Sequence, residues 1–185
     1  MGITLAEVYR CRLDEGGLRL IDTFIRMVKW WVDRAGSQRW GSYRGFRGSF
    51  YRDWLKAFPE WSTQLAHTSS LEAYSRIRLY REPREWAIAA ELNTPVAVLH
   101  PKMLKIEKGY LRITARRTKV KEDRYIYVEL EPLNKQQREL LKQVEKRLWK
   151  IGQVILAREW ALISFKARRM EPEVLEIVER LLIKG

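Results

Sequence analysis

The sequence predicts an α+β protein in which helices interrupt an antiparallel β-sheet domain after its first strand and a further helix follows at the C-terminus. Three features support this prediction. Residues 4–12 alternate well enough to indicate a half-buried strand. Residues 18–32 and 62–81 place apolar or small residues three and four positions apart, as helices that pack on one face do. From residue 103 onward the two-residue alternation returns in several short segments.

In the first strand, Leu5, Val8 and Cys11 are expected to supply the apolar surface. The helix over residues 18–32 is expected to end near Gly36. The residues that follow, 38–52, contain three glycines and are interpreted as a loop.

Two serines are candidate N-caps for the next helices. Ser49 would begin a short helix that ends at Pro59, and Ser62 a longer one that runs to about Arg81. Small residues on one face of the longer helix would let a neighbouring helix approach closely. This face comprises Ala66, Ser70, Ala73, Ile77 and Tyr80. Residues 84–93 suit one or two helical turns, and residues 94–101 suit an extended segment between prolines.

The rest of the chain predicts most of the sheet. A β-hairpin turns at Lys108 and Gly109, and residues 124–130 form a third strand of the same group. Asn134 would cap a helix that ends at Gly152, followed by strands over residues 153–158 and 160–166 and by an amphipathic helix that opens at Pro172. Alternation assigns to the core Leu104, Ile106, Leu111, Ile113, Ile126, Val128 and Leu130, and directs Lys105 and Arg112 to the opposite face.

The charge of the chain indicates an acidic partner. Its 185 residues carry a formal net charge of +13 and a pI near 10.0, which favour nucleic acid first and an anionic membrane surface second. No apolar run is long enough to span a bilayer and the N-terminus has no signal-peptide pattern, so we expect a soluble, cytoplasmic protein. A single cysteine and two separated histidines predict neither a disulfide nor a zinc site. High charge with few Cys, Asn and His is typical of hyperthermophile proteins.

The arginine-aromatic segment, residues 34–52, contains five arginines and no acidic residue. Guanidinium groups and aromatic rings stack on unpaired bases, and arginine also binds phosphate oxygens. The alternative is a solvated loop whose aromatic side chains fill the neighbouring core. The RNA-binding residues predicted here, with Trp40, Tyr43 and Phe46 as the stacking side chains, are Arg34, Arg39, Trp40, Tyr43, Arg44, Phe46, Arg47 and Arg52.

The lysine-arginine segment, residues 102–124, holds nine basic and three acidic residues. A small β-barrel commonly binds single-stranded or structured nucleic acid on a surface of this kind. The alternative is an edge hairpin that lysines protect from aggregation. The RNA-binding residues predicted here are Lys102, Lys105, Lys108, Arg112, Arg116, Arg117, Lys119 and Lys121.

The sequence offers no pattern that indicates catalysis. It contains no phosphate-binding loop, dinucleotide-binding motif or nucleophile elbow, and the carboxylate pairs at residues 14–15 and 122–123 suit turns. We therefore expect a protein that is not an enzyme and that uses neither a metal ion nor a cofactor.

Three stretches resemble the N-terminal half of the TnpB (OrfB) proteins, the transposon-encoded RNA-guided nucleases related to type V CRISPR effectors. Residues 50–77, FYRDWLKAFPEWSTQLAHTSSLEAYSRI, are similar to a helix of archaeal members, and residues 95–114, PVAVLHPKMLKIEKGYLRIT, to the strand pair after the helical region. Residues 160–166, WALISFK, are similar to the strand that precedes the nuclease domain. The resemblance covers residues 4–168.

The resemblance implies a wedge-type, OB-like antiparallel β-barrel formed by residues 1–16 and 95–185, with a helical recognition lobe over residues 17–94. In the family these parts bind guide RNA and its duplex with target DNA. Residues 168–185 do not resemble the RuvC-like nuclease domain of the family or its zinc ribbon, so no catalytic residue is carried over. The terminal helix is expected to close the domain.

Together these features predict a non-catalytic RNA-binding protein that is a structural component of a ribonucleoprotein. The first candidate is an accessory ribosomal protein that binds ribosomal RNA in a thermophilic archaeon, where neighbouring proteins of the particle would be further partners. Two alternatives stay open: a transposon-derived TnpB-like regulator that binds guide RNA or DNA, and one half of a split nuclease. We expect the two basic segments to form the walls of one RNA-binding cleft.

Overall fold

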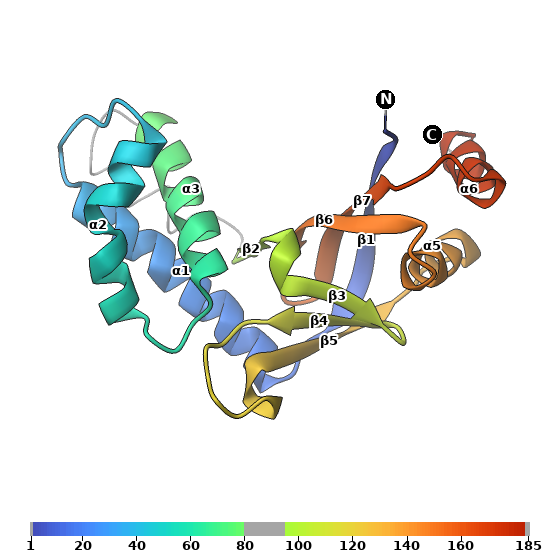
Figure 1. Ribbon diagram of the computed structural model, residues 1–185, viewed down its shortest axis with the longest axis horizontal. Helices are drawn as coiled ribbons and strands as arrows, with labels where there is room; N and C mark the ends of the chain where they lie inside the picture. Colours follow the sequence, from blue (N-terminus) through green and yellow to red (C-terminus); the bar gives the residue numbers. More distant parts are fainter. Residues whose placement is uncertain (1, 80–94, 184–185) are drawn as a thin grey trace.

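The computed structural model describes residues 2–79 and 95–183 (Figure 1). The predictions for Tyr80, Arg81 and residues 84–93 lie outside the described residues. The strands are β1 (Thr4–Arg12), β2 (Ala97–Leu99), β3 (Leu104–Glu107), β4 (Tyr110–Thr114), β5 (Tyr125–Glu131), β6 (Trp149–Leu156) and β7 (Trp160–Ala167). The helices are α1 (Glu15–Ala35), α2 (Tyr43–Ala57), α3 (Thr63–Leu79), α5 (Lys135–Glu145) and α6 (Pro172–Leu182), with short 3-10 helices η1 (Pro101–Met103) and η2 (Glu122–Arg124).

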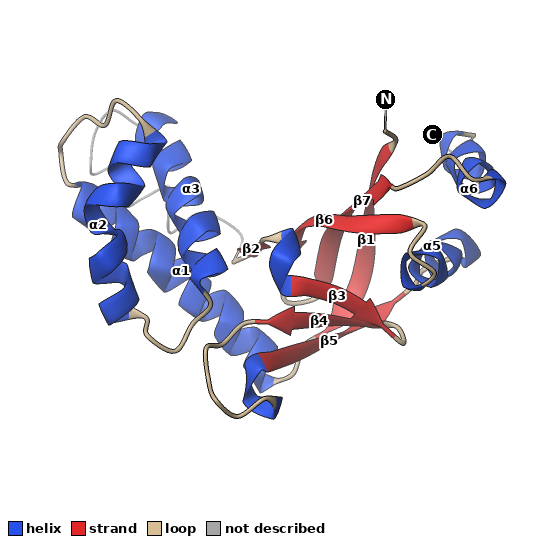
Figure 2. Cartoon of the chain, in the orientation of Figure 1, coloured by secondary structure: helices blue, strands red, loops and turns tan. Residues whose placement is uncertain are grey.

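The seven strands form one antiparallel sheet in the order β2-β6-β7-β1-β5-β4-β3, which curves into an open half-barrel (Figure 2). Helices α1, α2 and α3, which come between β1 and β2 in the chain, gather at one end of the molecule, and α5 and α6 lie at the other (Figure 1). The prediction of an α+β protein with an antiparallel sheet, helices after the first strand and a C-terminal helix is confirmed. No described helix is both long and apolar enough to cross a membrane.

Strand β1 lies in the middle of the sheet, paired with β7 through residues 4–10 and with β5 through residues 10–12. Tyr9 and Cys11 face the core and are buried, whereas Val8 is 48% exposed. The strand was predicted correctly, but Val8 was assigned to the wrong face, because alternation from Cys11 directs the odd-numbered residues inward. Burial of Tyr9 is possible because its hydroxyl donates a hydrogen bond to the carbonyl of Gln137 (3.1 Å).

Helix α1 is longer than the sequence predicted. It begins at Glu15 because the carboxylate of Asp14 accepts the backbone N–H of Gly17 (2.8 Å), an N-cap that was interpreted as part of a turn. It ends as predicted at Gly36, whose φ of 55° favours glycine. Helix α3 packs along α1, and the predicted small-residue face of α3 is buried at Ala66, Ser70, Ala73 and Ile77.

Helix α2 corrects the interpretation of residues 38–52 as a loop. Its N-cap is Ser42, whose hydroxyl accepts the N–H of Gly45 (3.1 Å), and the predicted cap Ser49 lies within the helix. The aromatic side chains at positions 43, 46, 50 and 54 recur at helical spacing and bury one face. That burial outweighs the cost of about 1 kcal/mol for each interior glycine, both of which lie on the exposed side.

The β3–β4 hairpin has the predicted register, with Leu104 opposite Ile113 and Ile106 opposite Leu111. Its two turn residues, Lys108 and Gly109, both have positive φ (50° and 81°), as a type I′ turn requires. The inward residues of β3, β4 and β5 are buried, apart from half-buried Leu104.

Helix α5 is capped by Asn134 as predicted but ends at Glu145, not at Gly152. Arg147, with φ of 65°, turns the chain, and β6 begins at Trp149. Gly152 therefore lies in β6, at an irregularity of the β6–β7 pairing. Burial of Trp149 explains the early strand, because its indole N–H donates to Gln143 of α5 (2.9 Å) while the ring packs in the core.

Candidate nucleic-acid interface

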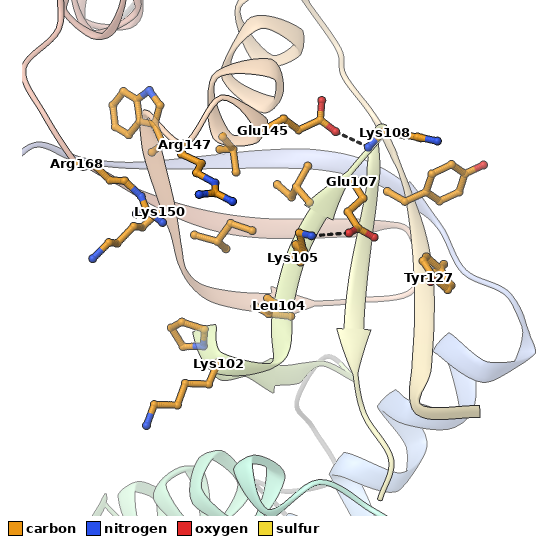
Figure 3. Close-up of a pocket in the computed structure, with 16 residues that line it drawn as sticks. Lys102, Leu104, Lys105, Glu107, Lys108, Tyr127, Glu145, Arg147, Lys150 and Arg168 are labelled. Atoms are coloured by element: carbon orange, nitrogen blue, oxygen red, sulfur yellow. Dashed lines mark hydrogen bonds and ion pairs between the residues drawn. The ribbon is translucent and has the colours of Figure 1, made fainter. Parts of the chain in front are cut away.

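A hollow of about 1050 Å³ opens where the half-barrel does not close (Figure 3). Its long sides are residues 104–107 of β3 and residues 149–151 of β6, so we name it the seam hollow. Helix α5 contacts both strands at one end, and η1 borders the other. Because β3 pairs only with β4, and β6 reaches β2 only through residues 154–156, the two facing strand edges have no strand partner among the described residues.

Cationic side chains from separate elements line the rim of the seam hollow, and those of Lys102, Lys108 and Lys150 extend outward from it (Figure 3). They come from η1, β3, the hairpin turn, the α5–β6 turn, β6 and the residue after β7. A backbone hydrogen bond from Arg168 to the carbonyl of Leu148 (2.9 Å) fixes the last of these beside the α5–β6 turn. The six residues are Lys102, Lys105, Lys108, Arg147, Lys150 and Arg168.

Both carboxylates that line the seam hollow are already engaged. Glu107 accepts a hydrogen bond from Lys105 (2.7 Å) and contacts Arg112 (3.3 Å). The bond from Lys105, followed by the charge of Arg112, holds the pKa of Glu107 below its ordinary value. Glu145 accepts the backbone N–H of Lys108. The remaining five cations of the hollow form no ion pair with any residue in ranges 2–79 and 95–183, so the hollow is strongly positive.

The floor of the seam hollow is apolar. It is formed by half-buried Leu104, Val144 and Ile151, together with buried Ile106 and Trp149. The hollow can therefore bind a ligand that carries both negative charge and apolar surface.

Two exposed tyrosines continue the lining across the hairpin. Tyr110 and Tyr127 are 42% and 46% exposed. In the sheet register Lys105 lies opposite Arg112 and Arg112 opposite Tyr127, so two of the predicted basic residues share a row with an exposed ring. The Arg112 guanidinium lies 4.6 Å from the ring centre of Tyr125.

A second hollow of about 600 Å³ adjoins the first and shares Arg147, Lys150 and Arg168 with it. It adds Lys146, which pairs with Glu173 (3.8 Å), and two further cations, Lys166 and Arg169. Sequence analysis missed all six, because they lie in two separate stretches, residues 146–150 and 166–169. The signal that could have found them is the register of β6 and β7, in which Lys150 lies directly opposite Lys166.

The C-terminal half of the lysine-arginine segment lies elsewhere, beside the start of α3. Arg116 and Arg117, with Lys119 and Arg124, line a hollow of about 510 Å³. The guanidinium of Arg116 lies 5.4 Å from the ring centre of Trp61, and the N–H of Arg117 donates to the carbonyl of Glu60 (2.8 Å). Lys119 and Lys121 are exposed. The segment therefore divides between two surfaces.

Most aromatic side chains of the arginine-aromatic segment belong to the core. Phe46 is fully buried, with ring centres of Trp31, Trp40, Phe50 and Tyr74 all within 6.1 Å of its own. The prediction that Phe46 stacks on RNA is wrong, because the helical spacing of the segment turns this ring toward α1 and α3.

Trp40 and Tyr43 are half-buried and also make internal contacts. The Trp40 indole donates to the carbonyl of Ala35 (3.4 Å), and the Tyr43 hydroxyl contacts Nδ1 of His67 (3.1 Å). These contacts agree with the alternative interpretation, in which the aromatic side chains fill the core.

The arginines of the same segment remain on the surface. Arg34 stacks over Trp30 (5.0 Å) and Arg47 over Tyr51 (4.7 Å). Among the described residues no ion pair involves these two or the exposed Arg39, Arg44 and Arg52.

The two basic segments approach each other at a pair of histidines. The ring centres of His67 on α3 and His100, which precedes η1, are 5.6 Å apart. Burial, and then the cation of Arg47, lowers the pKa of His67. Burial, and then Lys102, lowers the pKa of His100, whose Nδ1 accepts the N–H of Lys102 (3.1 Å). Both shifts favour the neutral form of the ring.

Neither a scan against models of known protein families nor a search of curated proteins finds a match to this chain. Within the described part of the chain, no three His, Cys, Asp or Glu side chains are grouped so as to hold a metal ion.

Proposed function

We propose that the protein binds RNA through the seam hollow and the basic surface that adjoins it, as a non-catalytic component of a cytoplasmic ribonucleoprotein. The observation that carries this proposal is that five cations without a described counter-ion line one hollow: Lys102, Lys108, Arg147, Lys150 and Arg168. Such a concentration of positive charge attracts a polyanion and raises its local concentration.

Exposed aromatic rings beside the cations favour a nucleic acid over other polyanions. Tyr127 presents its ring opposite Arg112, and Tyr110, which lies between Glu107 and Glu129, adds a second exposed ring to the lining. Bases stack on such rings while the cations hold phosphates, and the combination is a recurrent feature of surfaces that bind nucleic acid. A flat membrane surface would not enter the hollow.

The chain order also supports this proposal. One strand, a group of helices and then the rest of the sheet is the order that the resemblance to TnpB proteins implies. We accordingly propose that the half-barrel is a wedge-like, OB-like barrel left open at the seam. Ribosomal RNA is the proposed ligand because it is the most abundant structured RNA of a cell, and a basic protein of this size suits a ribosomal particle.

The experiment that tests the proposal is ultraviolet crosslinking of the native protein, sequencing of the bound RNA and sedimentation of the extract on a sucrose gradient. We expect ribosomal RNA to be recovered and the protein to sediment with a ribosomal particle. A protein that stays at the top of the gradient and recovers no RNA above background contradicts the proposal. Recovery of one transposon-encoded RNA would replace the ribosomal assignment with that of a transposon-derived regulator.

A further inference from the structure

The rim and the floor of the seam hollow differ in character. Cations stand at the rim, while Leu104, Val144 and Ile151 present apolar surface between them. A continuous RNA duplex presents phosphates, sugar hydroxyls and base edges, and its base faces stay stacked inside. Such a duplex could pair its phosphates with the cations of the rim but would leave the apolar floor exposed to water. An unpaired base has two apolar faces that can cover this floor.

The size of the hollow agrees with a nucleotide. Its volume of about 1050 Å³ is close to the upper end of the range of pockets that enclose small organic ligands, about 300–1,000 Å³. An open hollow on this scale, bordered by β3, β6, α5 and η1, has room for individual nucleotides rather than for a helix.

The strand edges that face the hollow supply hydrogen-bonding groups that can recognise a base. The backbone N–H and C=O groups on these edges of β3 and β6 have no ladder partner in the described part of the chain. The hydrogen-bonding edges of an unpaired base carry matching donors and acceptors. A buried base could therefore satisfy backbone groups that a phosphate alone would leave open.

The adjoining surfaces give the rest of the strand a path. On one side the lining continues to the rings of Tyr110 and Tyr127. On the other side it continues through Arg147, Lys150 and Arg168 into the second hollow. A single flexible strand can follow this curved route, because its backbone is not held in a helix.

We infer that the seam hollow takes an unpaired nucleotide of an RNA strand, its base on the apolar floor and its phosphates on the cationic rim. The inference rests on the proposed function and specifies its ligand as single-stranded RNA or a bulged base. The base enters between β3 and β6, and the flanking nucleotides lie on the tyrosines and in the second hollow.

Three RNA probes of one sequence test the inference by fluorescence anisotropy: a single strand without self-pairing, a perfect duplex, and a duplex with one bulged 2-aminopurine. We expect the single strand and the bulged duplex to bind at least tenfold more tightly than the perfect duplex. The fluorescence of the bulged base should change on binding. Equal affinity for the perfect duplex would overturn the inference while leaving RNA binding intact, whereas no binding to any probe would overturn the proposed function itself.

A variant that fills the floor without removing charge provides the second test. Ile151→Trp narrows the seam hollow, and Ile155→Trp adds the same bulk to the same strand outside its lining. Ile151→Trp should abolish the preference for unpaired RNA and the 2-aminopurine signal but keep the weaker duplex binding. Ile155→Trp should behave as the wild type. If a folded Ile151→Trp protein keeps the preference for unpaired RNA, the base does not enter this hollow. If that variant does not fold, the affinities of the wild-type protein for the three probes still decide whether the inference holds.

An acidic peptide is the competing occupant, since it too could pair with free strand edges. An oligoglutamate with the same number of charges as the single strand should compete poorly, because it has no base to cover the floor. Competition as effective as that of the unlabelled RNA strand would overturn the inference.

Discussion

Phe46 occupies the centre of an aromatic cluster that joins three helices, since its ring touches those of Trp31 on α1, Phe50 on α2 and Tyr74 on α3. Truncation to alanine would leave a cavity between these rings. We expect Phe46→Ala to lower the free energy of unfolding by about 3–5 kcal/mol, measured by urea denaturation. The exposed neighbour Arg44→Ala should change it by no more than about 0.5 kcal/mol. If Phe46→Ala left the free energy of unfolding almost unchanged, this ring would not be part of the core.

His67 and His100 should make stability depend on pH. Their pKa values are lowered in the folded protein, chiefly by burial. The unfolded chain, with ordinary values near 6.5, takes up protons first as the pH falls. The free energy of unfolding is therefore complete above about pH 6.5 and decreases as the pH falls toward the folded-state pKa values. Thermal melts from pH 7.5 to 5 should show a shallower decline for the His67→Gln/His100→Gln double variant than for the wild type. If the melting temperatures of the wild type and the double variant declined equally, the two histidines would not be the source of the pH dependence.

At the scale of elements, two glycines should respond in opposite directions to the same substitution. Gly109 has φ of 81° in the β3–β4 turn, a conformation that a side chain disfavours. We expect Gly109→Ala to lower the free energy of unfolding by about 1–2 kcal/mol. Gly48 lies within α2, where an added Cβ would meet nothing within 4 Å. Gly48→Ala should therefore stabilise the protein by up to about 1 kcal/mol. Thermal melts of both variants test these two predictions. A change of melting temperature in the same direction for both variants would contradict the assigned backbone conformations.

The same two elements show what a sequence can predict at this scale. The β3–β4 hairpin follows from strict alternation on both sides of Lys108-Gly109, because apolar and charged residues never exchange places there. In α2 the aromatic stripe is equally regular, but glycines and arginines between its members resemble a loop. Burial of Phe46 and Trp54 decides in favour of the helix, and burial is a tertiary effect that the local pattern does not contain.

For the whole molecule, the positive charge at the seam should control how strongly binding depends on salt. Replacing Arg147, Lys150 and Arg168 together with alanine would remove three of the proposed phosphate contacts. The slope of log affinity against log salt for a single-stranded RNA should become shallower by about 2, since each contact contributes about 0.7. Anisotropy titrations at several salt concentrations measure this slope.

A matched control for this prediction removes three exposed charges from the described surface outside both hollows. Lys135, Arg138 and Lys142 lie on α5 and line neither of them. Their triple alanine variant has the same net charge as the seam variant and should keep the wild-type slope. If both variants flatten it equally, overall charge rather than the seam governs binding.

The candidate site is also the part of the molecule that the sequence predicted least completely. Lys102, Lys105 and Lys108 fall in one basic segment and were found, whereas Arg147, Lys150 and Arg168 lie in separate stretches of moderate charge. Their convergence depends on where α5 ends and on the register of β6 against β7. The end of α5 and the start of β6 were misjudged once Gly152 was taken as the end of the helix, and no register was predicted. A surface assembled from distant segments requires the fold before it can be recognised.

Helix α1 has a consequence for the molecule as a physical object. Its 21 residues span about 30 Å, and it contacts β2 and β5 of the sheet as well as α2 and α3. One unbroken helix thus joins the helical group to the sheet. A partner that bound the helical end would be kept at a fixed distance and orientation from a ligand in the seam hollow. In an assembly the protein would act as a rigid spacer. Lengthening α1 by one turn would move its contacts with the sheet about 5.4 Å farther from its contacts with α2 and α3.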